Sequence, residues 1–313
     1  MSSHVMLQIA VLAEMCLASG PASPTAKELL DRFAATMDRC QTSYACTEEG
    51  TRVSVIKKAP SPPFRLGEHT WHYWREYRWD GQRFRRRERA WGEYEKEPFP
   101  LSRSKEQAEY HITLYDLDRT IEYSTALDDR PKPHMTYTPW RWDRQAVLRD
   151  ASNNNVVIPR VDVDLRTCPN AKVRPTREPV NGVDCYVIEG RTAEAKFTVW
   201  IDPNHGYNVA KWIRETLTGY TVTSTIAFRR IDGTWIPVER ATQMTTSMPI
   251  DQQITEQVKV IDFKIAPDHA ALKSFEVDEE IPNGTSVGWV LPDRRVLMDY
   301  VWKDGKPVRE AKK

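Results

Sequence analysis

The stretch that decides the fold spans residues 197–213 and reads FTVWIDPNHGYNVAKWI. Apolar residues occupy alternate positions on both sides of its centre, which is the period of a half-buried β-strand. At the centre, Pro203 presets φ for a turn, and Gly206 permits the positive φ at which a chain reverses direction. The stretch therefore predicts two antiparallel strands joined by one tight turn.

Four two-residue turn signals extend this antiparallel plan along the chain. They are Asp80-Gly81, Asn181-Gly182, Asp232-Gly233 and Asp304-Gly305. Such dipeptides fit the twist of a β-hairpin, whereas the helical crossovers that parallel strands require have no counterpart in the pattern. A long meander must also hide its edge strands. The sequence therefore predicts a mainly β (α+β) protein built as a strongly curved antiparallel sheet or half-open β-barrel.

One amphipathic helix precedes this meander. Thr25 and Glu28 form a capping box, so a helix should begin there. An apolar stripe at helical spacing follows, formed by Leu29, Leu30, Phe33 and Met37. We expect this N-terminal helix, with short helices at residues 104–110 and after Asp143, to pack in or over the concave face of the sheet.

The charge balance excludes a general electrostatic attraction to nucleic acid. Lys and Arg total 45, and Asp and Glu total 44, so any electrostatic recognition must be local. No later stretch reaches the ~18 apolar residues of a membrane helix. We predict a monomer without a nucleic-acid partner and without a transmembrane segment in the mature chain.

The N-terminus resembles a secretory signal, because an apolar run over residues 5–18 is followed by small residues. The run lacks a basic start and contains Gln8 and Glu14, so a misplaced start codon or an uncleaved buried segment is the alternative. Cys16 is a poor match to a lipidation signal. We predict a periplasmic or otherwise exported protein, divided into a signal peptide (1–24), a half-barrel domain (25–266) and a C-terminal extension with a short helix and a hairpin (267–313).

Four cysteines remain after removal of the signal: Cys40, Cys46, Cys168 and Cys185. Sequence proximity favours pairing the first two and the last two in an oxidising compartment, and free buried thiols are the alternative. Their spacing is not that of a zinc site. His69 and His72 fall on opposite faces of one predicted strand. We therefore predict neither a metal nor a cofactor.

A second hairpin, over residues 69–91, is rich in tryptophan and arginine. Its return strand places four guanidinium groups on one face: Arg83, Arg85, Arg87 and Arg89. Such a row could hold an anionic lipid head group or an acidic protein partner. The alternative is a solvated outer face whose charge is offset by neighbouring glutamates.

Several of these pieces together resemble the bacterial outer-membrane lipoprotein-sorting proteins and a wider group of uncharacterised planctomycete-type relatives. The pieces are the helix from Ala26 to Cys40, residues 181–190 (NGVDCYVIEG), the Trp-Ile-Asp-Pro turn at 200–203, and Phe275 with residues 281–287 (IPNGTSV). The resemblance implies a half-open barrel with helices over an apolar concavity. Its members carry acylated lipoproteins, bind lipids or regulate anti-sigma factors. This chain is longer than the dedicated lipoprotein carrier. It contains the tryptophan- and arginine-rich hairpin as an insertion and has a C-terminal extension from about Pro267.

No catalytic signature accompanies these features. There is no Gly-x-Ser-x-Gly, phosphate loop or His-x-x-x-His pattern, and Asp202 and His205 are turn residues. We therefore predict an exported, non-enzymatic protein that binds lipid acyl chains or lipoproteins. An envelope scaffold or stress-sensing module that binds another protein is the alternative, and an unrecognised hydrolase is a less favoured one.

The candidate lining of an apolar cavity comes from the helix and from two predicted strands. The residues are Leu30, Phe33, Met37, Phe197, Val199, Ile201, Tyr220, Val222 and Phe228. The same side chains would serve equally well in a closed core, and the sequence leaves that alternative open.

Overall fold

The structure is a computed structural model that describes residues 23–60, 64–93, 102–125, 134–139, 165–166, 168–277, 280–291, 293 and 295–310. Its helical elements are α2 (Ala26–Gln41) and the 3-10 turn η1 (Lys105–Gln107). The first strands are β1 (Tyr44–Lys58), β2 (Gly67–Trp79), β3 (Phe84–Glu93), β4 (Ser102–Arg103), β5 (Glu109–Tyr115), β6 (Thr120–Ser124), β7 (His134–Thr138), β8 (Lys172–Val173) and β9 (Glu178–Val180). They are followed by β10 (Val183–Arg191), β11 (Ala195–Asp202), β12 (Asn208–Thr216), β13 (Thr221–Ile231), β14 (Thr234–Thr246), β15 (Asp251–Ile265), β16 (Ser286–Val290), β17 (Val296–Lys303) and β18 (Lys306–Arg309).

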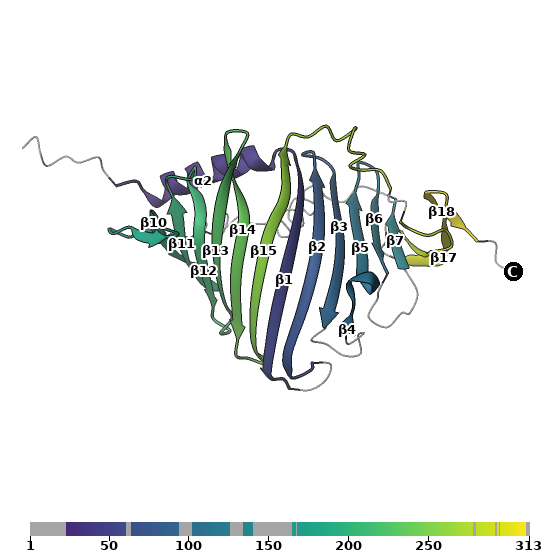
Figure 1. Cartoon of the computed structure of the whole chain (residues 1–313), viewed down its shortest axis with the longest axis horizontal. Helices are drawn as coiled ribbons and strands as arrows, with labels where there is room; N and C mark the ends of the chain where they lie inside the picture. Colours follow the sequence, from purple (N-terminus) through teal and green to yellow (C-terminus); the bar gives the residue numbers. More distant parts are fainter. Residues whose placement is uncertain are drawn as a thin grey trace, which may run out of the picture.

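The first strand of the sequence lies in the middle of the sheet. β1 pairs with β2 on one edge and with β15 on the other. From β15 the sheet continues through β14, β13, β12 and β11 to β10, with β8 and β9 beside β10. From β2 it continues through β3, β5, β6 and β7 to β16, β17 and β18, with β4 beside β3. Figure 1 shows this single curved sheet with α2 at one end.

The predicted fold class is confirmed, with one departure. β7 and β16 pair in parallel, whereas the other described pairs are antiparallel. The chain leaves β15 in the middle of the sheet, and the segment that follows crosses one face of the sheet before β16 pairs with β7. A long connection of this kind permits parallel pairing without a crossover helix.

Two local predictions are confirmed. The capping box is present: the Glu28 amide donates to Thr25 Oγ1 at 3.2 Å, and the Thr25 amide donates to Glu28 Oε2 at 2.8 Å. The decisive stretch forms β11 and β12 around a turn with Gly206 at φ 72°. The helix expected at residues 104–110 is reduced to η1, because Tyr110, Ile112 and Leu114 alternate as β5. The helix expected after Asp143 lies outside the described residues.

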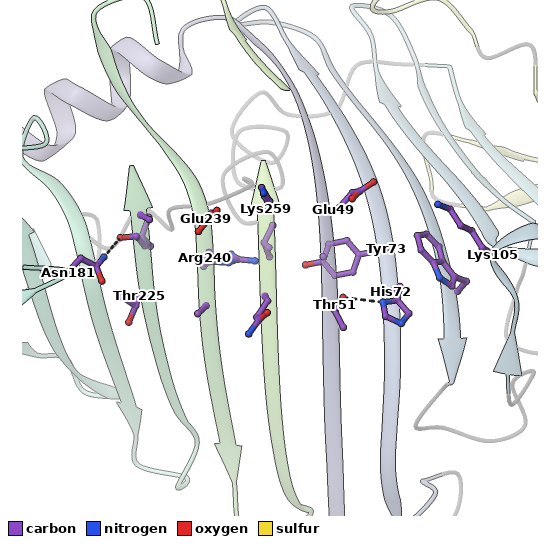
Figure 2. A pocket seen from close by; sticks show the side chains of 17 residues that line it. Glu49, Thr51, His72, Tyr73, Lys105, Asn181, Thr225, Glu239, Arg240 and Lys259 are labelled. Carbon is purple, nitrogen blue, oxygen red and sulfur yellow. Dashed lines mark hydrogen bonds between the residues drawn. The ribbon is translucent and has the colours of Figure 1, made fainter. Parts of the chain in front are cut away.

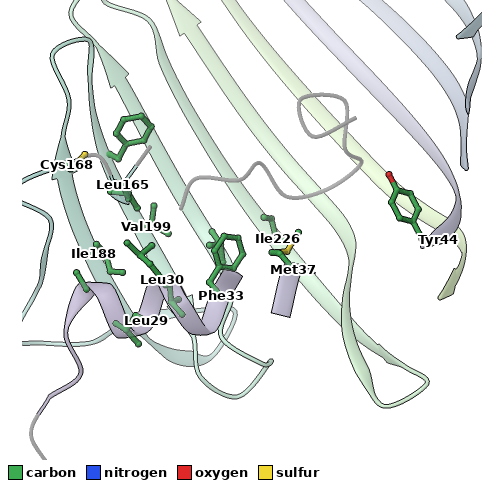
Figure 3. Packing of buried hydrophobic residues seen from close by; sticks show 14 of the residues in the cluster. Leu29, Leu30, Phe33, Met37, Tyr44, Leu165, Cys168, Ile188, Val199 and Ile226 are labelled. Carbon is green, nitrogen blue, oxygen red and sulfur yellow. The ribbon is translucent and has the colours of Figure 1, made fainter. Parts of the chain in front are cut away.

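Both faces of the sheet bury apolar side chains, and different segments cover them. The face that carries α2, here called the helix face, buries the α2 stripe against β10, β11 and β13 (Figure 3). In the half formed by β5, β6, β7 and β16, the apolar residues point to the opposite face, here called the far face. There Ile112, Leu114 and Met135 pack under Phe275 and Ile281 of the chain that follows β15. The C-terminal segment thus covers the far face of β5, β6 and β7. On the far face near β9 and β10, Val187 and Trp200 are also buried.

Gly50 allows a side chain to cross the central strand. A Cβ at Gly50 would lie 2.1 Å from Cζ of Tyr73, so the Tyr73 ring rests directly on the β1 backbone. This position lets the Tyr73 hydroxyl donate to Glu256 Oε1 at 3.0 Å, on the strand beyond β1. Gly50 is therefore required by close approach, and it ties β2 to β15 across β1.

We predict that Gly50→Ala lowers the free energy of unfolding by about 1–3 kcal/mol, because the added methyl overpacks this contact. Urea unfolding would measure the change. In a Tyr73→Ala background the same substitution should cost much less, since the clashing ring is gone. Equal costs in both backgrounds would contradict the proposed contact.

Candidate functional site

The helix face changes from apolar to charged along β1. Tyr44 and Cys46 belong to the apolar core, but Glu48, the next residue on the same face, is also buried, with 1% of its surface exposed. Glu48 Oε1 accepts from the Tyr77 hydroxyl at 3.1 Å and lies 3.7 Å from Arg75 Nη1. Glu48 Oε2 has no hydrogen-bond partner among the described residues. A carboxyl group is therefore held in the interior with only part of its bonding capacity used.

Two further ion pairs surround this carboxyl group on the helix face. Arg75 donates through Nε to Glu88 Oε2 at 2.8 Å, and Arg240 donates through Nη2 to Glu256 Oε2 at 2.8 Å. The Arg75 guanidinium also lies 3.8 Å from the centre of the Tyr73 ring. A cavity of about 230 Å³ adjoins these groups, lined by Arg52, Ser54, His69, Trp71, Tyr73, Arg75, Glu88, Glu93 and Glu256. We call this cavity the polar cavity.

The carboxyl groups of this cluster differ in their protonation. Burial raises the pKa of Glu48 to about 7, and Arg75 only partly offsets that rise. Burial acts in the same direction on Glu88, but the paired Arg75 guanidinium outweighs it and holds the pKa of Glu88 below its usual value. Near neutral pH Glu88 is therefore ionised, whereas Glu48 exchanges between its charged and neutral forms.

We predict that Glu48 makes stability fall as pH rises from about 4.5 to about 7. The unfolded chain releases this proton near 4.5, while the folded chain keeps it until about 7, so the folded state binds more protons in between. The loss should approach about 3 kcal/mol. Urea unfolding between pH 4.5 and 8 should show a flatter profile for Glu48→Gln, which keeps an acceptor for Tyr77. Parallel profiles would contradict the assignment.

The predicted cavity residues are largely packed against one another. Leu30, Phe33 and Met37 of α2 lie against Phe197, Val199 and Ile201 in one cluster, and none of the six is more than 4% exposed. Val222 is buried. Phe228 is half-buried and stacks on His205 with ring centres 5.6 Å apart. Tyr220 is half-buried and donates to Met244 Sδ at 3.2 Å. The six residues of the first cluster therefore pack as a core, and the contact of any of the predicted residues with a ligand stays a prediction.

The arginine row of β3 lies on the far face and contacts the C-terminal segment. Arg85 is 3% exposed and donates to Glu76 Oε1 at 3.1 Å and to the carbonyls of Lys273 and Glu276 at 3.3 and 3.4 Å. The alternative of a solvated face is therefore wrong for Arg85.

The other three arginines of the row have partners as well. Arg83 pairs with Asp80 at 2.8 Å and lies over the Phe275 ring, Arg89 pairs with Glu280 at 2.6 Å, and Arg87 lies 3.8 Å from Glu76. An external anionic partner for this row stays a prediction, and it would have to compete with these internal contacts.

We predict that Arg85→Ala lowers the free energy of unfolding by about 2–3 kcal/mol, because hydrogen bonds from a buried charged donor are lost. The rate at which a protease cleaves the chain within residues 273–277 should also rise. Arg89→Ala is the matched control, since its exposed ion pair contributes under about 1 kcal/mol. Similar behaviour of the two variants would show that Arg85 does not anchor the segment.

A larger groove lies on the far face, across the middle of the sheet (Figure 2). Its volume is about 660 Å³, and it extends from Asn181 at one end to Trp91 and Lys105 at the other. Between them lie Glu49, Gly50, Thr51, His72, Tyr73, Thr225, Ile226, Ala227, Glu239, Arg240, Ala241, Gln257, Val258 and Lys259. Sequence reasoning missed this groove and the polar cavity, because both depend on which strands become neighbours.

The turn residues behave as expected. Asp202 Oδ1 accepts from the amides of Asn204 and His205 at 2.8 and 3.1 Å, and its Oδ2 lies 2.6 Å from His205 Nδ1. Asp202 therefore shapes the turn between β11 and β12. Among the described residues no group of His, Cys, Asp and Glu has the arrangement of a metal site.

The four cysteines of the described chain are buried thiols that form neither predicted disulfide pairing. Burial raises the pKa of Cys40 to about 11 and that of Cys185 to about 12. Both thiols are therefore un-ionised and poorly nucleophilic at neutral pH.

Comparison with known proteins leaves the family open. No protein-family model and no curated protein matches the chain. Among solved structures, lipoprotein LppX of Mycobacterium tuberculosis is similar, with 10% identity and a TM-score of 0.30 over 77% of this chain and 97% of LppX. Lipovitellin, solved in a study of lipid-protein interactions, has 9% identity and a TM-score of 0.28 over 73% of this chain and 26% of its own. The resemblance to lipoprotein-sorting proteins therefore stays a prediction.

The helices of the described part of the chain include none that is both long and apolar enough to span a membrane.

Proposed function

We propose that the protein is an exported, non-enzymatic binding protein for amphiphiles with an acyl chain. One observation carries the proposal: on a single face of the sheet, a continuous apolar surface beneath α2 adjoins a buried charged cluster with a cavity. An amphiphile has the same division between an apolar chain and a polar head. The apolar surface would receive the chain, and the polar cavity would receive the head.

The apolar part would become available by displacement of α2. The helix contributes a narrow stripe of large side chains, and its polar contacts to the turn before β12 are few: Thr36 donates to the Gly206 carbonyl at 2.5 Å, and Arg32 donates to the Tyr207 hydroxyl. A bound acyl chain would replace the stripe. Each buried CH₂ group contributes about 0.8 kcal/mol, so a chain of ordinary length can offset the lost contacts.

The buried charged cluster supports this assignment, because a protein core does not require buried charges. Burying Arg75, Glu88 and Glu48 costs desolvation energy that apolar side chains of similar volume would not incur. The cluster instead offers fixed donors and acceptors at the boundary of the apolar surface. A ligand site places a few oriented polar groups among apolar walls in this way.

The proposal predicts saturable binding of a fluorescent C16 fatty-acyl probe to the delipidated full-length chain. Phe33→Asp, which puts a carboxylate on the apolar stripe, should weaken binding at least tenfold. Ala35→Asp adds the same charge to the exposed side of α2 and should change the affinity less than twofold.

Circular dichroism and thermal unfolding would show that both α2 variants are folded at the assay temperature. If Phe33→Asp does not fold, Arg52→Gln tests the polar cavity without touching the stripe, and it should alter the preference among probes that share one chain and differ in head group. Absence of saturable binding by the unsubstituted chain would overturn the proposed function.

A further inference from the structure

The groove on the far face is built from two neighbouring rows of side chains that cross the strands. Residues opposed in an antiparallel ladder share a face, so the register places one row on six adjacent strands from β13 to β3. This row consists of Thr225, Ala241, Gln257, Thr51, His72 and Trp91. Five spacings between strands make it about 24 Å long.

The second row runs beside the first and carries alternating charge. It consists of Ala227, Glu239, Lys259 and Glu49, on β13, β14, β15 and β1. The last three of these side chains are exposed. Negative, positive and negative groups thus follow one another, so this part of the groove has no strong field of either sign.

Side chains form a wall at each end of the groove. Asn181 and Lys105 lie outside the two rows, whereas His72 and Trp91 are the last members of the first row. At one end Asn181, in the turn before β10, donates to the Ile226 carbonyl at 3.0 Å. At the other end the Trp91 ring stacks on His72 with centres 5.8 Å apart, and Lys105 Nζ lies 5.4 Å from the Trp91 ring centre. Thr51 and His72 are joined by a hydrogen bond of 3.1 Å, which fixes this end wall. Figure 2 shows Asn181 and Lys105 at these two ends, with the other lining side chains between them.

The chemistry of the floor argues against three classes of ligand. A nucleic acid needs an excess of positive charge, and here Lys105 and Lys259 are balanced by Glu49 and Glu239. An acyl chain needs a continuous apolar floor, but here the side chains of Glu49, Glu239, Gln257 and Lys259 interrupt the apolar groups along the groove. A peptide that adds to the sheet needs a free strand edge, whereas this groove crosses strands that are already paired on both sides.

We propose that this groove binds a neutral glycan in an extended form. Threonine hydroxyls and the amides of Gln257 and Asn181 can both donate and accept hydrogen bonds, as sugar hydroxyls do. Small side chains at Ala227 and Ala241 leave room for a sugar chain to lie close to the sheet. The Trp91 and His72 rings offer an apolar body with a polar tip at one end. The site lies on the face opposite the polar cavity and does not depend on the proposed function.

The test is affinity electrophoresis of the full-length chain in native gels that contain a soluble neutral glucan, mannan or galactan. Retardation by at least one of them is expected. Carboxymethyl and diethylaminoethyl derivatives of the same polymer should retard the protein no more strongly. Retardation by a charged derivative alone would overturn the inference in favour of binding by charge, and retardation by none of the polymers would overturn it outright.

Variants on β14 locate the site. Ala241→Arg, at an exposed position on the groove floor, should reduce retardation at least tenfold because its side chain fills the groove. Thr245→Arg is the matched control: it adds the same side chain to the same face of the same strand, about 14 Å away and outside the groove. Gln257→Ala, which removes only an amide, should reduce affinity severalfold. Equal retardation of Ala241→Arg and Thr245→Arg would place any glycan binding elsewhere.

Discussion

The register of β1 against its two neighbours is the constraint on which the rest of the structure depends. β1 pairs with β2 along thirteen opposed residues and with β15 along nearly its whole length. A slip of one residue would move every β1 side chain to the other face. Glu48 would then leave Arg75, and Thr51 would leave the row that forms the groove floor. The contact between Tyr73 and Gly50 opposes such a slip, because only a glycine at that position admits the ring.

The same register decides which face each large apolar cluster occupies. Near β10 to β13 α2 covers apolar residues on the helix face, and a smaller apolar cluster lies on the opposite face. Near β5 to β7 the far face carries the large cluster, and the segment after β15 covers it. The polar features of the described residues lie on the central strands between these two large clusters. The polar cavity and the far-face groove therefore lie back to back on the central strands.

How much of this could be read from the sequence depends on the range of the interaction. The capping box of Thr25 and Glu28 and the turn at Asp202 are local, and both were predictable because their partners lie within three residues. The two backbone carbonyls that Arg85 contacts in the C-terminal segment lie 188 and 191 residues away, so the sequence indicated a row of charges but not the segment it binds. The polar cavity was unpredictable for the same reason, since Glu48, Arg75, Glu88 and Glu256 come from four strands. Even the apolar stripe of α2 could not reveal whether its partner surface was a core or a ligand site.

The buried charges of the helix face are more informative about function than about stability. A buried ion pair roughly balances its desolvation against its attraction, and apolar replacement is often neutral or stabilising. The fold would therefore lose little if Glu48, Arg75 and Glu88 were apolar, as their neighbours Tyr44 and Cys46 on the same face are. What apolar residues could not supply is a carboxyl group with an unused oxygen beside fixed guanidinium groups. The cluster thus has a physical rationale if it meets polar atoms beyond those of the described residues.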